Sequence, residues 1–391
     1  MPPLRRPTRK IRVGSVEVGG DAPVSIQSMT TTRTPDPRAT FDQVLALSTA
    51  GADIVRVTVP DEESADGLAL LLWLMTSTPR PVPIIADIHF RHDLALKCIE
   101  LGVAGLRLNP GNIKDPDKIR LVAREAGARG IPIRVGANAG SLHTSFLEAH
   151  GGPTPEALVA SAMWEVALLE EEGFHDIKIS VKHSNPWEMV RSYRLLADTT
   201  DYPLHLGVTE AGTAFAGSMK SAVGIGTLLA EGIGDTIRVS LAADPVEEVR
   251  TGKAILSALG LRRSGADIVA CPTCGRVEGD VITIAEQVED ALKDVKAPIQ
   301  VAIMGCLVNG PGEAREADVG LALSKHGGTL FSKGERLREV GPDVMVQALL
   351  DEAMRLAAGM GEGEPVVLTA AAAKAPEPPA NGRRRLPLSR S

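Results

Sequence analysis

The chain has 391 residues, of which 44% are hydrophobic, and its formal net charge is −7 at pH 7. This length and apolar content predict a globular protein with a large core and two or three domains. A negative charge argues against a general nucleic-acid-binding protein, which needs a basic face to displace counterions from the phosphate backbone. No apolar run is long enough to span a membrane, and the basic start lacks the apolar segment of a secretory signal. We therefore expect a cytoplasmic protein that binds neither nucleic acid nor membrane.

From Val24 to Gly260 the sequence repeats a short β-rich run, a loop and a longer amphipathic segment. The β-rich runs are at residues 24–26, 53–59, 84–88, 105–108, 133–135, 176–181, 204–208 and 236–241. Helical stretches between them include residues 40–49, 92–101, 118–128, 156–172 and 245–259, and several end at a glycine cap. About eight such units predict a (β/α)8 TIM barrel over residues 1–262. A doubly wound open sheet is the main structural alternative, which periodicity alone does not exclude.

The pattern changes beyond Gly260. We expect strands that lead into Cys271 and Cys306 with a helix at 280–295 between them, then a strand at 316–323, a hairpin around Lys333-Gly334 and a helix at 343–358. These elements predict a small α+β domain over residues 263–360. Residues 361–391 are rich in Ala, Pro and Arg, a composition that cannot form a packed core, so we expect a disordered tail there.

Cations stand inside the apolar strands of the expected barrel, each on a different strand: Arg56, Arg107, Arg134, Lys182 and Arg238. A buried cation is costly unless it is paired, so any one of these alone would most often indicate a structural ion pair. A set that converges at the C-terminal mouth of one barrel better fits a phosphate-bearing ligand, which guanidinium groups bind through paired hydrogen bonds. Asn109, Asn138 and Ser240 follow these cations by two or four residues, so strand alternation places them on the same side.

Two acidic residues, Asp87 and Glu210, also end strands of the expected barrel. They would either balance the charge of the arginines or bind substrate hydroxyl groups and move protons. The sequence leaves both roles open.

Three of the four cysteines lie in two glycine-rich loops, each of which follows an apolar run. Cys271 and Cys274 form a Cys-x-x-Cys pair, and Cys306 ends the second run. They are too few and too clustered for a secreted disulfide framework, and thiolates in a reducing compartment select iron–sulfur clusters or zinc. Cys98 lies far upstream in an amphipathic helix, so the fourth ligand is not a cysteine. Glu313, seven residues after Cys306 in the same loop, is the best-placed substitute.

The strings that carry these residues closely resemble the 4-hydroxy-3-methylbut-2-enyl diphosphate synthase family of isoprenoid biosynthesis. The resemblance runs from about Ile11 to about Met360 and rests on CPTCGR at 271–276, GCLVNGPGEA at 305–314, SIQSMT at 25–30, ADIHF at 86–90, RLNPGN at 107–112 and RVSLAADP at 238–245. Several long strings in one order are far more specific than a lone motif. The short path from Gly260 to Cys271 corresponds to the bacterial two-domain form, without a large third domain between barrel and cluster module.

The resemblance implies the two-electron reductive dehydration of 2-C-methyl-D-erythritol 2,4-cyclodiphosphate to 4-hydroxy-3-methylbut-2-enyl diphosphate. It implies one 4Fe-4S cluster per chain, held by Cys271, Cys274, Cys306 and Glu313 and reduced by an external flavodoxin or ferredoxin. The implied substrate-binding residues are Arg56, His89, Arg107, Asn109, Arg134, Asn138, Lys182, Arg238 and Ser240, and the implied catalytic residues are Glu313, Glu210 and Asp87. A strand-end histidine is often structural, so the place of His89 in the site depends mainly on this resemblance.

The connection between the two expected domains also bears on assembly. The last helix of a TIM barrel begins near the mouth and ends near the opposite face. A cluster domain attached there by the short Ser264-Gly265-Ala266 segment is poorly placed to cap its own barrel. A head-to-tail homodimer, in which each cluster domain caps the partner's barrel, resolves this geometry, and the family resemblance implies the same assembly.

Two other classes of protein stay open at this point. A non-redox barrel enzyme, such as a pterin-type condensing enzyme, would use the three cysteines and one further ligand to hold structural zinc. A binding protein without chemistry would not need so many inward-facing charged groups.

Overall fold

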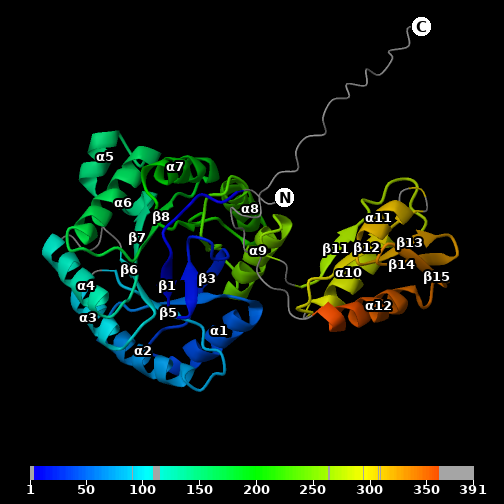
Figure 1. Ribbon diagram of the computed structural model, residues 1–391, viewed down its shortest axis with the longest axis horizontal. Helices are drawn as coiled ribbons and strands as arrows, with labels where there is room; N and C mark the ends of the chain where they lie inside the picture. The colour runs from blue at the N-terminus through cyan, green and yellow to red at the C-terminus, as the bar shows by residue number, and fades with distance from the viewer. Residues whose placement is uncertain are drawn as a thin grey trace, which may run out of the picture.

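The computed structural model describes residues 4–89, 91–108, 115–262, 265–293, 295–306, 308 and 310–360. These residues form two lobes, a large barrel and a smaller domain, which are joined after helix α9 (Pro245–Ala258) (Figure 1). The tail expected at residues 361–391 lies outside the described residues, so its disorder stays a prediction.

Eight parallel strands form the barrel in the order β8-β7-β6-β5-β4-β3-β10-β9. They are β3 (Ser25–Met29), β4 (Ile54–Thr58), β5 (Ile84–Asp87), β6 (Gly105–Leu108), β7 (Ile133–Asn138), β8 (Ile177–Lys182), β9 (His205–Leu206) and β10 (Thr236–Ile237). The two ends of this order meet through a parallel bridge between Ile179 of β8 and Leu204, the residue just before β9. The barrel is therefore nearly closed, which confirms the predicted TIM barrel and excludes the open doubly wound sheet.

Helices surround this barrel: α1 (Pro37–Ala50), α2 (Glu62–Met75), α3 (His92–Glu100), α4 (Pro116–Ala128), α5 (Thr144–His150), α6 (Pro155–Glu170), α7 (Pro186–Thr199), α8 (Ala214–Ala230) and α9, with a short 3-10 turn η1 (Ala139–Ser141) before α5. Several begin at an Asp, Asn or Thr whose side chain accepts a backbone N–H, followed by proline in the first turn. This combination satisfies a free N–H group and fixes the backbone at the start of a helix.

A hairpin that the sequence analysis did not predict closes the N-terminal end of the barrel. It consists of β1 (Ile11–Val13) and β2 (Val16–Val18), and its apolar side chains pack against Ile54 and Ile85. The open end is therefore the C-terminal one, which we call the mouth.

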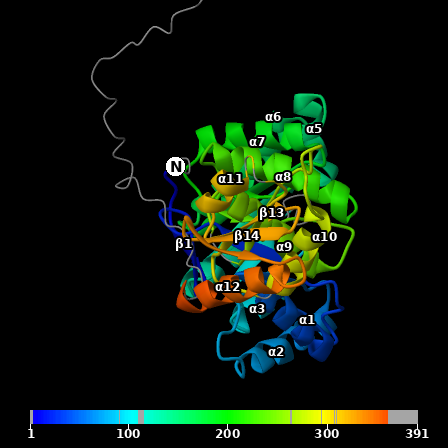
Figure 2. The ribbon, with the colours of Figure 1, turned by 90° about the vertical axis from the view of Figure 1, so that its right-hand side faces the viewer.

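The smaller domain is a mixed sheet in the order β11-β12-β13-β14-β15. Its strands are β11 (Asp267–Ala270), β12 (Gln300–Met304), β13 (Val319–Ser324), β14 (Gly327–Ser332) and β15 (Glu335–Val340). Helices α10 (Val281–Leu292) and α12 (Met345–Met360) share an apolar core with one face of the sheet, and the short α11 (Gly310–Glu316) packs on the other face (Figure 2). The α+β domain is confirmed.

Two local predictions in this domain have different outcomes. The hairpin around Lys333-Gly334 is confirmed, with φ of 50° and 83° at these two residues, as a tight two-residue turn between strands requires. The strand expected at 316–323 begins only at Val319, because residues 310–316 fold as α11. Glu313 is therefore in a helix, and its predicted place in a loop is wrong. None of the described helices is long and apolar enough to cross a bilayer.

Candidate active site

A row of charged side chains crosses four neighbouring strands on the inner face of the barrel. The register sets Asp87 opposite Arg107, Arg107 opposite Arg134, and Arg134 opposite Lys178. Residues paired in this way point to the same side of a sheet. All four are buried, with at most 5% of each residue exposed. Like charges directly opposite each other are destabilising, so three adjacent cations beside one carboxylate require more negative charge.

Asp87 is the acidic centre of this row. Arg107 donates a hydrogen bond from Nη1 to Asp87 Oδ1 at 2.9 Å, and Arg56 Nη1 lies 3.4 Å from Oδ2. His89 Nε2 is 4.0 Å from the same oxygen. Burial raises the pKa of Asp87, but Arg56 and Arg107 outweigh burial and bring this pKa down to about 2. Asp87 is therefore ionised at pH 7, where it balances charge and can accept a proton but not donate one.

Arg238 has its own carboxylate partner, Glu248 in the first turn of α9. Arg238 Nη2 lies 3.4 Å from Glu248 Oε1, which also accepts the backbone N–H of Leu241 at 2.9 Å. Ser28 donates to the other oxygen of Glu248 at 3.3 Å. Glu248 was not predicted from the sequence, because an acid in the first turn of a helix is fully explained by the helix dipole.

The cations of the barrel interior exceed their carboxylate partners. Burial lowers the pKa of Arg56 to about 10, although Asp87 opposes this shift. Burial and then neighbouring cations lower the pKa values of Arg134 and Lys182 well below the usual range. Within the part of the chain that the structure describes, buried donors without a hydrogen-bond partner include the Nε atoms of Arg56, Arg107, Arg134 and Arg238, Nη1 of Arg134, and Ser240 Oγ. Buried donors are rarely left unpaired in proteins. This set fits an anion that brings several acceptor oxygens.

Two glycines on the inner face leave space for these cations. A Cβ on Gly136 would lie 3.4 Å from Arg134 Nη2 and 3.8 Å from Arg107 Nε. A Cβ on Gly207 would lie 2.9 Å from Lys182 Nζ. The cationic side chains of Arg107, Arg134 and Lys182, from strands β6, β7 and β8, therefore lie beside positions that have no side chain of their own.

The other predicted residues of the barrel have mixed outcomes. Asn138 ends β7 directly opposite Lys182, as strand alternation predicts. Ser240 is half-buried beyond β10, and Glu210 is exposed beyond β9. Asn109 lies outside the described residues, so its role stays a prediction. Lys178 was missed, although it also stands inside an apolar strand, which is the signal that predicted the other cations.

Glu210 has a backbone conformation that L-residues rarely adopt, with φ of 52°. Such strain persists where a functional side chain is needed. We expect Glu210→Gly to raise the free energy of unfolding by about 1 kcal/mol, because glycine adopts this conformation without steric cost, and to lower turnover. Urea denaturation and steady-state assays measure the two effects. Lys333→Gly, at φ of 50° in the distant hairpin turn, should stabilise equally with unchanged turnover. Full turnover of Glu210→Gly would remove Glu210 from the reaction.

The cysteines gather at one end of the smaller domain. Cys271 directly follows β11, and its backbone N–H donates to Ile303 of β12 at 2.9 Å. Cys306 lies two residues beyond β12, and a Cβ on the intervening Gly305 would be 3.4 Å from Cys271 Sγ. Two soft ligands from neighbouring strand ends therefore lie close together.

Arg276 is hydrogen-bonded to Cys274, and its positive charge is also close enough to Cys306 and Cys271 to be affected by them. The backbone N–H and then the side chain of Arg276 lower the pKa of Cys274, and the charges of Cys274, Cys306 and Cys271 all raise the pKa of Arg276. This shared cation indicates that the three sulfur atoms face one region. Helix α11, which carries Glu313, begins beside Met304 at the same end of β12.

The chemistry of this donor set fits an iron–sulfur cluster, since three thiols and one carboxylate lie on segments that meet at one end of the sheet. Among the described residues, no three His, Cys, Asp or Glu side chains are close enough together to hold a metal ion. The ligand set Cys271, Cys274, Cys306 and Glu313 therefore stays a prediction.

Both lobes match one protein family. Residues 8–253 match the GcpE TIM-barrel domain, and residues 267–355 match the GcpE protein C-terminal domain. The 4-hydroxy-3-methylbut-2-en-1-yl diphosphate synthase (flavodoxin) of Nocardia farcinica is 55% identical over 368 residues, which are 93% of this chain and 94% of that protein. The synthase of the same name from Frankia alni is 54% identical over 93% of this chain and 95% of its own length. The chain belongs to the 4-hydroxy-3-methylbut-2-en-1-yl diphosphate synthase family.

Membership of the synthase family covers both domains, so the chain is an enzyme and the pterin-type alternative is not supported. The barrel is also similar to dihydropteroate synthase from Stenotrophomonas maltophilia, with a TM-score of 0.46 and 16% identity over 63% of this chain and 98% of that chain. This likeness is too distant to bear on function.

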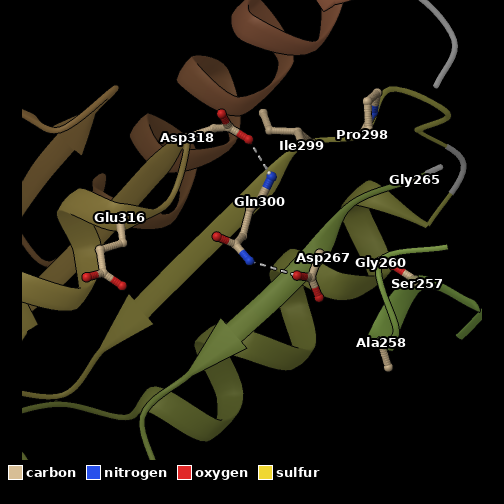
Figure 3. A pocket seen from close by; sticks show the side chains of 10 residues that line it. All are labelled: Ser257, Ala258, Gly260, Gly265, Asp267, Pro298, Ile299, Gln300, Glu316 and Asp318. Atoms are coloured by element: carbon tan, nitrogen blue, oxygen red, sulfur yellow. Dashed lines mark hydrogen bonds between the residues drawn. The ribbon is translucent and has the colours of Figure 1, made fainter. Parts of the chain in front are cut away.

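The connection between the lobes lies far from the predicted reactive groups of both. It is at the end of the barrel opposite the mouth, and at the end of the smaller domain opposite the cysteines. Arg262, just after α9, donates two hydrogen bonds to Asp53 at 2.9 and 2.7 Å, and Asp53 precedes β4 at the N-terminal end of the barrel. A cavity of about 510 Å³ separates the end of α9 from the start of β11 and β12 (Figure 3). Gln300 in its wall donates to Asp318 at 2.8 Å and to Asp267 at 2.9 Å. Cys271 lies at the far end of β11.

Proposed function

We propose that this chain converts 2-C-methyl-D-erythritol 2,4-cyclodiphosphate to 4-hydroxy-3-methylbut-2-enyl diphosphate. The observation that carries the proposal is the excess of buried, partly unpaired cations at the mouth of a barrel that belongs to the synthase family. A cyclic diphosphate carries acceptor oxygens on two phosphorus atoms, which match several guanidinium donors. The reaction adds two electrons and one proton, opens a C–O bond to phosphate and releases one water.

The residues of the mouth would hold the substrate as follows. The diphosphate is bound by the strand cations Arg56, Arg107, Arg134, Lys182 and Arg238 together with Ser240. His89, Asn109 and Asn138 contact the remaining oxygens. Because the pKa of Asp87 is about 2, Asp87 acts by fixing Arg56 and Arg107. Glu210, at the exposed edge of the mouth, is the carboxylate better placed to move a proton.

Cys271, Cys274, Cys306 and Glu313 would hold one 4Fe-4S cluster. When bound, the cluster supplies the electrons and a Lewis-acidic iron beside the substrate. A carboxylate is a harder and more exchangeable ligand than a thiolate, so Glu313 would leave one iron accessible. The relatives from Nocardia farcinica and Frankia alni carry flavodoxin in their names. Flavodoxin is the donor that we propose, and ferredoxin is the alternative.

Iron analysis of anaerobically purified protein tests the proposal. The expected result is a brown protein with broad absorbance near ~400 nm, about four irons per chain, and product formation with reduced flavodoxin. A colourless protein that contains stoichiometric zinc and does not turn over the cyclic diphosphate would refute the redox function.

Removing one mouth cation should weaken substrate binding and leave the cluster spectrum intact. A buried charge-assisted contact contributes about 1.5–3 kcal/mol, so Arg134→Ala or Arg238→Ala should bind substrate roughly tenfold to hundredfold more weakly. Isothermal titration calorimetry with the cyclic diphosphate measures this loss. Arg194→Ala, which removes an exposed ion pair with Glu231, is the matched control and should bind normally. Unchanged binding with a lower melting temperature would instead make Arg134 and Arg238 structural.

We also propose a head-to-tail homodimer with sites formed in trans. Arg262 holds the connection at the N-terminal end of the barrel, and the cysteines follow strands that lead away from this connection. A cluster domain attached in this way is directed away from the mouth of its own barrel. A second copy is the partner that can bring a cluster to each mouth.

A further inference from the structure

His205 is a fully buried histidine whose ring has no partner among the described residues. It lies in β9 with 0% of its surface exposed, and neither ring nitrogen has a hydrogen-bond partner there. Thr236 is its neighbour in the register, and two residues further along the chain, just beyond β9, the missing side chain of Gly207 leaves room for Lys182. The ring therefore faces the barrel interior beneath the mouth. Buried polar groups of this kind are rare and need a physical reason.

The charged groups around this ring are cations from three strands. Lys182 lies above it and Lys178 below it, both on β8, with Lys178 Nζ 3.4 Å from Thr236 Oγ1. Arg134 on β7 and Arg56 on β4 contribute further positive charge. Burial, and then repulsion by these groups, lowers the pKa of His205 well below its usual value. The ring is therefore neutral when no anion is bound.

The remaining neighbours do not offset this repulsion. Tyr193 of α7 donates its hydroxyl hydrogen to the backbone carbonyl of His205, so it does not reach the ring. Asp235, just before β10, is occupied by Arg5 and by the backbone N–H of Leu204. Thr236 contributes only a hydroxyl group. A negative charge that would protonate the ring has to come from a ligand.

We propose that His205 takes up a proton when the cyclic diphosphate binds above it, and that this imidazolium is a proton source for the reaction. The inference rests on the proposed function. An anion among Arg56, Arg134 and Lys182 offsets the repulsion that keeps the ring neutral. The reduction consumes one proton for every two electrons, because the departing hydroxyl leaves as water while the oxygen of the broken C–O bond stays on the diphosphate as an anion. His205 would hold this proton on the barrel side of the substrate.

Proton linkage predicts how substrate binding should depend on pH. A group whose pKa is low in the free enzyme and higher in the complex takes up a proton on binding, so binding tightens as pH falls between the two pKa values. One linked proton changes the dissociation constant by up to about tenfold per pH unit. Lysines that also take up protons would do so equally in wild type and in a His205 variant, so the difference isolates the imidazole.

Calorimetry of the oxidised holoenzyme with the cyclic diphosphate, in buffers of different ionisation enthalpy, counts the protons taken up without turnover. We expect wild type to take up more protons than His205→Gln, by up to about one per site, with a steeper pH dependence of binding between pH 6 and 8. His175→Gln removes an exposed histidine that contacts Tyr202 and should match wild type. Equal uptake by wild type and His205→Gln overturns the inference, whereas absence of binding by wild type overturns the proposed function instead.

A spectroscopic measurement covers the case in which His205→Gln does not fold. The chain has eight histidines, so ¹⁵N-histidine labelling gives a small set of ring signals, and His205→Asn identifies the one that belongs to His205. In wild type this signal should change from a neutral tautomer to the doubly protonated form when substrate is added. If the signal stays neutral in the complex, His205 does not take up the proton.

Discussion

Replacing any one of Cys271, Cys274 and Cys306 by serine should remove the iron and abolish turnover. Each variant loses one of three soft ligands. Its metal affinity should therefore fall by more than the tenfold to hundredfold that follows removal of an outer-shell partner of a metal site. Iron analysis, absorbance near ~400 nm and turnover with reduced flavodoxin measure the effect. Cys98→Ser is the matched control, because burial raises the pKa of Cys98 to about 12 and holds its thiol in the barrel core. Normal iron content in the other three variants would exclude these cysteines as ligands.

Glu313→Ala should give a different result from the cysteine variants. With three thiolates retained, a cluster should still form, but the iron that the carboxylate holds should be lost easily, so that iron content falls from about four towards three per chain. Electron paramagnetic resonance distinguishes a three-iron from a four-iron cluster. Glu316→Ala, an exposed acid at the other end of the same helix, should keep wild-type iron. Wild-type iron and full turnover in Glu313→Ala would remove Glu313 from the ligand set.

The barrel could be predicted from the sequence because the same strand–loop–helix pattern is repeated about eight times. Each strand is short and apolar and is followed by a capped helix, so single errors of boundary do not change the number of units. The last two strands were predicted too long, since β9 and β10 pair over only two residues each and continue as extended backbone linked by a bond from Arg238 N to Leu206 O. The β1–β2 hairpin was missed because strands of three residues give no periodicity.

The candidate site was predicted where a charge interrupts an apolar run. Arg56, Arg107 and Arg134 stand out for this reason, and the structure buries all three together. His205 was missed because a histidine near the start of an apolar strand does not interrupt the apolar run as clearly as an arginine or lysine does. Helix α11 was missed because Gly310-Pro311-Gly312 has the composition of a turn, although proline and acidic residues also suit the first turn of a helix.

The arrangement of the cluster ligands could not be predicted to the same extent. Three thiolates repel one another unless a cation offsets their charge, and among the described residues Arg276 is a cation whose pKa all three raise. The final positions of the sulfur atoms therefore depend on the group that they bind, which the sequence names only by its ligand types. The same holds for Glu313, which is exposed on α11. These four residues therefore stay predicted ligands, and we expect a bound metal to set their geometry.

Mixing two inactive chains should restore activity if sites form between subunits. One chain carries Arg56→Ala in the barrel, and the other carries Cys306→Ser in the cluster domain. After co-expression or refolding at equal amounts, half of the dimers contain one copy of each chain. In a trans arrangement each mixed dimer has one site with both lesions and one intact site, so roughly a quarter of wild-type activity should return.

The control for this experiment pairs two barrel lesions, Arg56→Ala and Arg134→Ala. Every barrel is then defective, so no arrangement of the cluster domains restores an intact site, and activity above that of either variant alone would reveal contamination. If each site forms within one chain, the first mixture also stays inactive. We propose the trans arrangement on the basis of two features of the structure. Arg262 is hydrogen-bonded to Asp53 at the N-terminal end of the barrel, and Cys271 follows β11 at the end of the smaller domain away from this connection, so in the proposed head-to-tail dimer a second copy would bring thiols and guanidinium groups together.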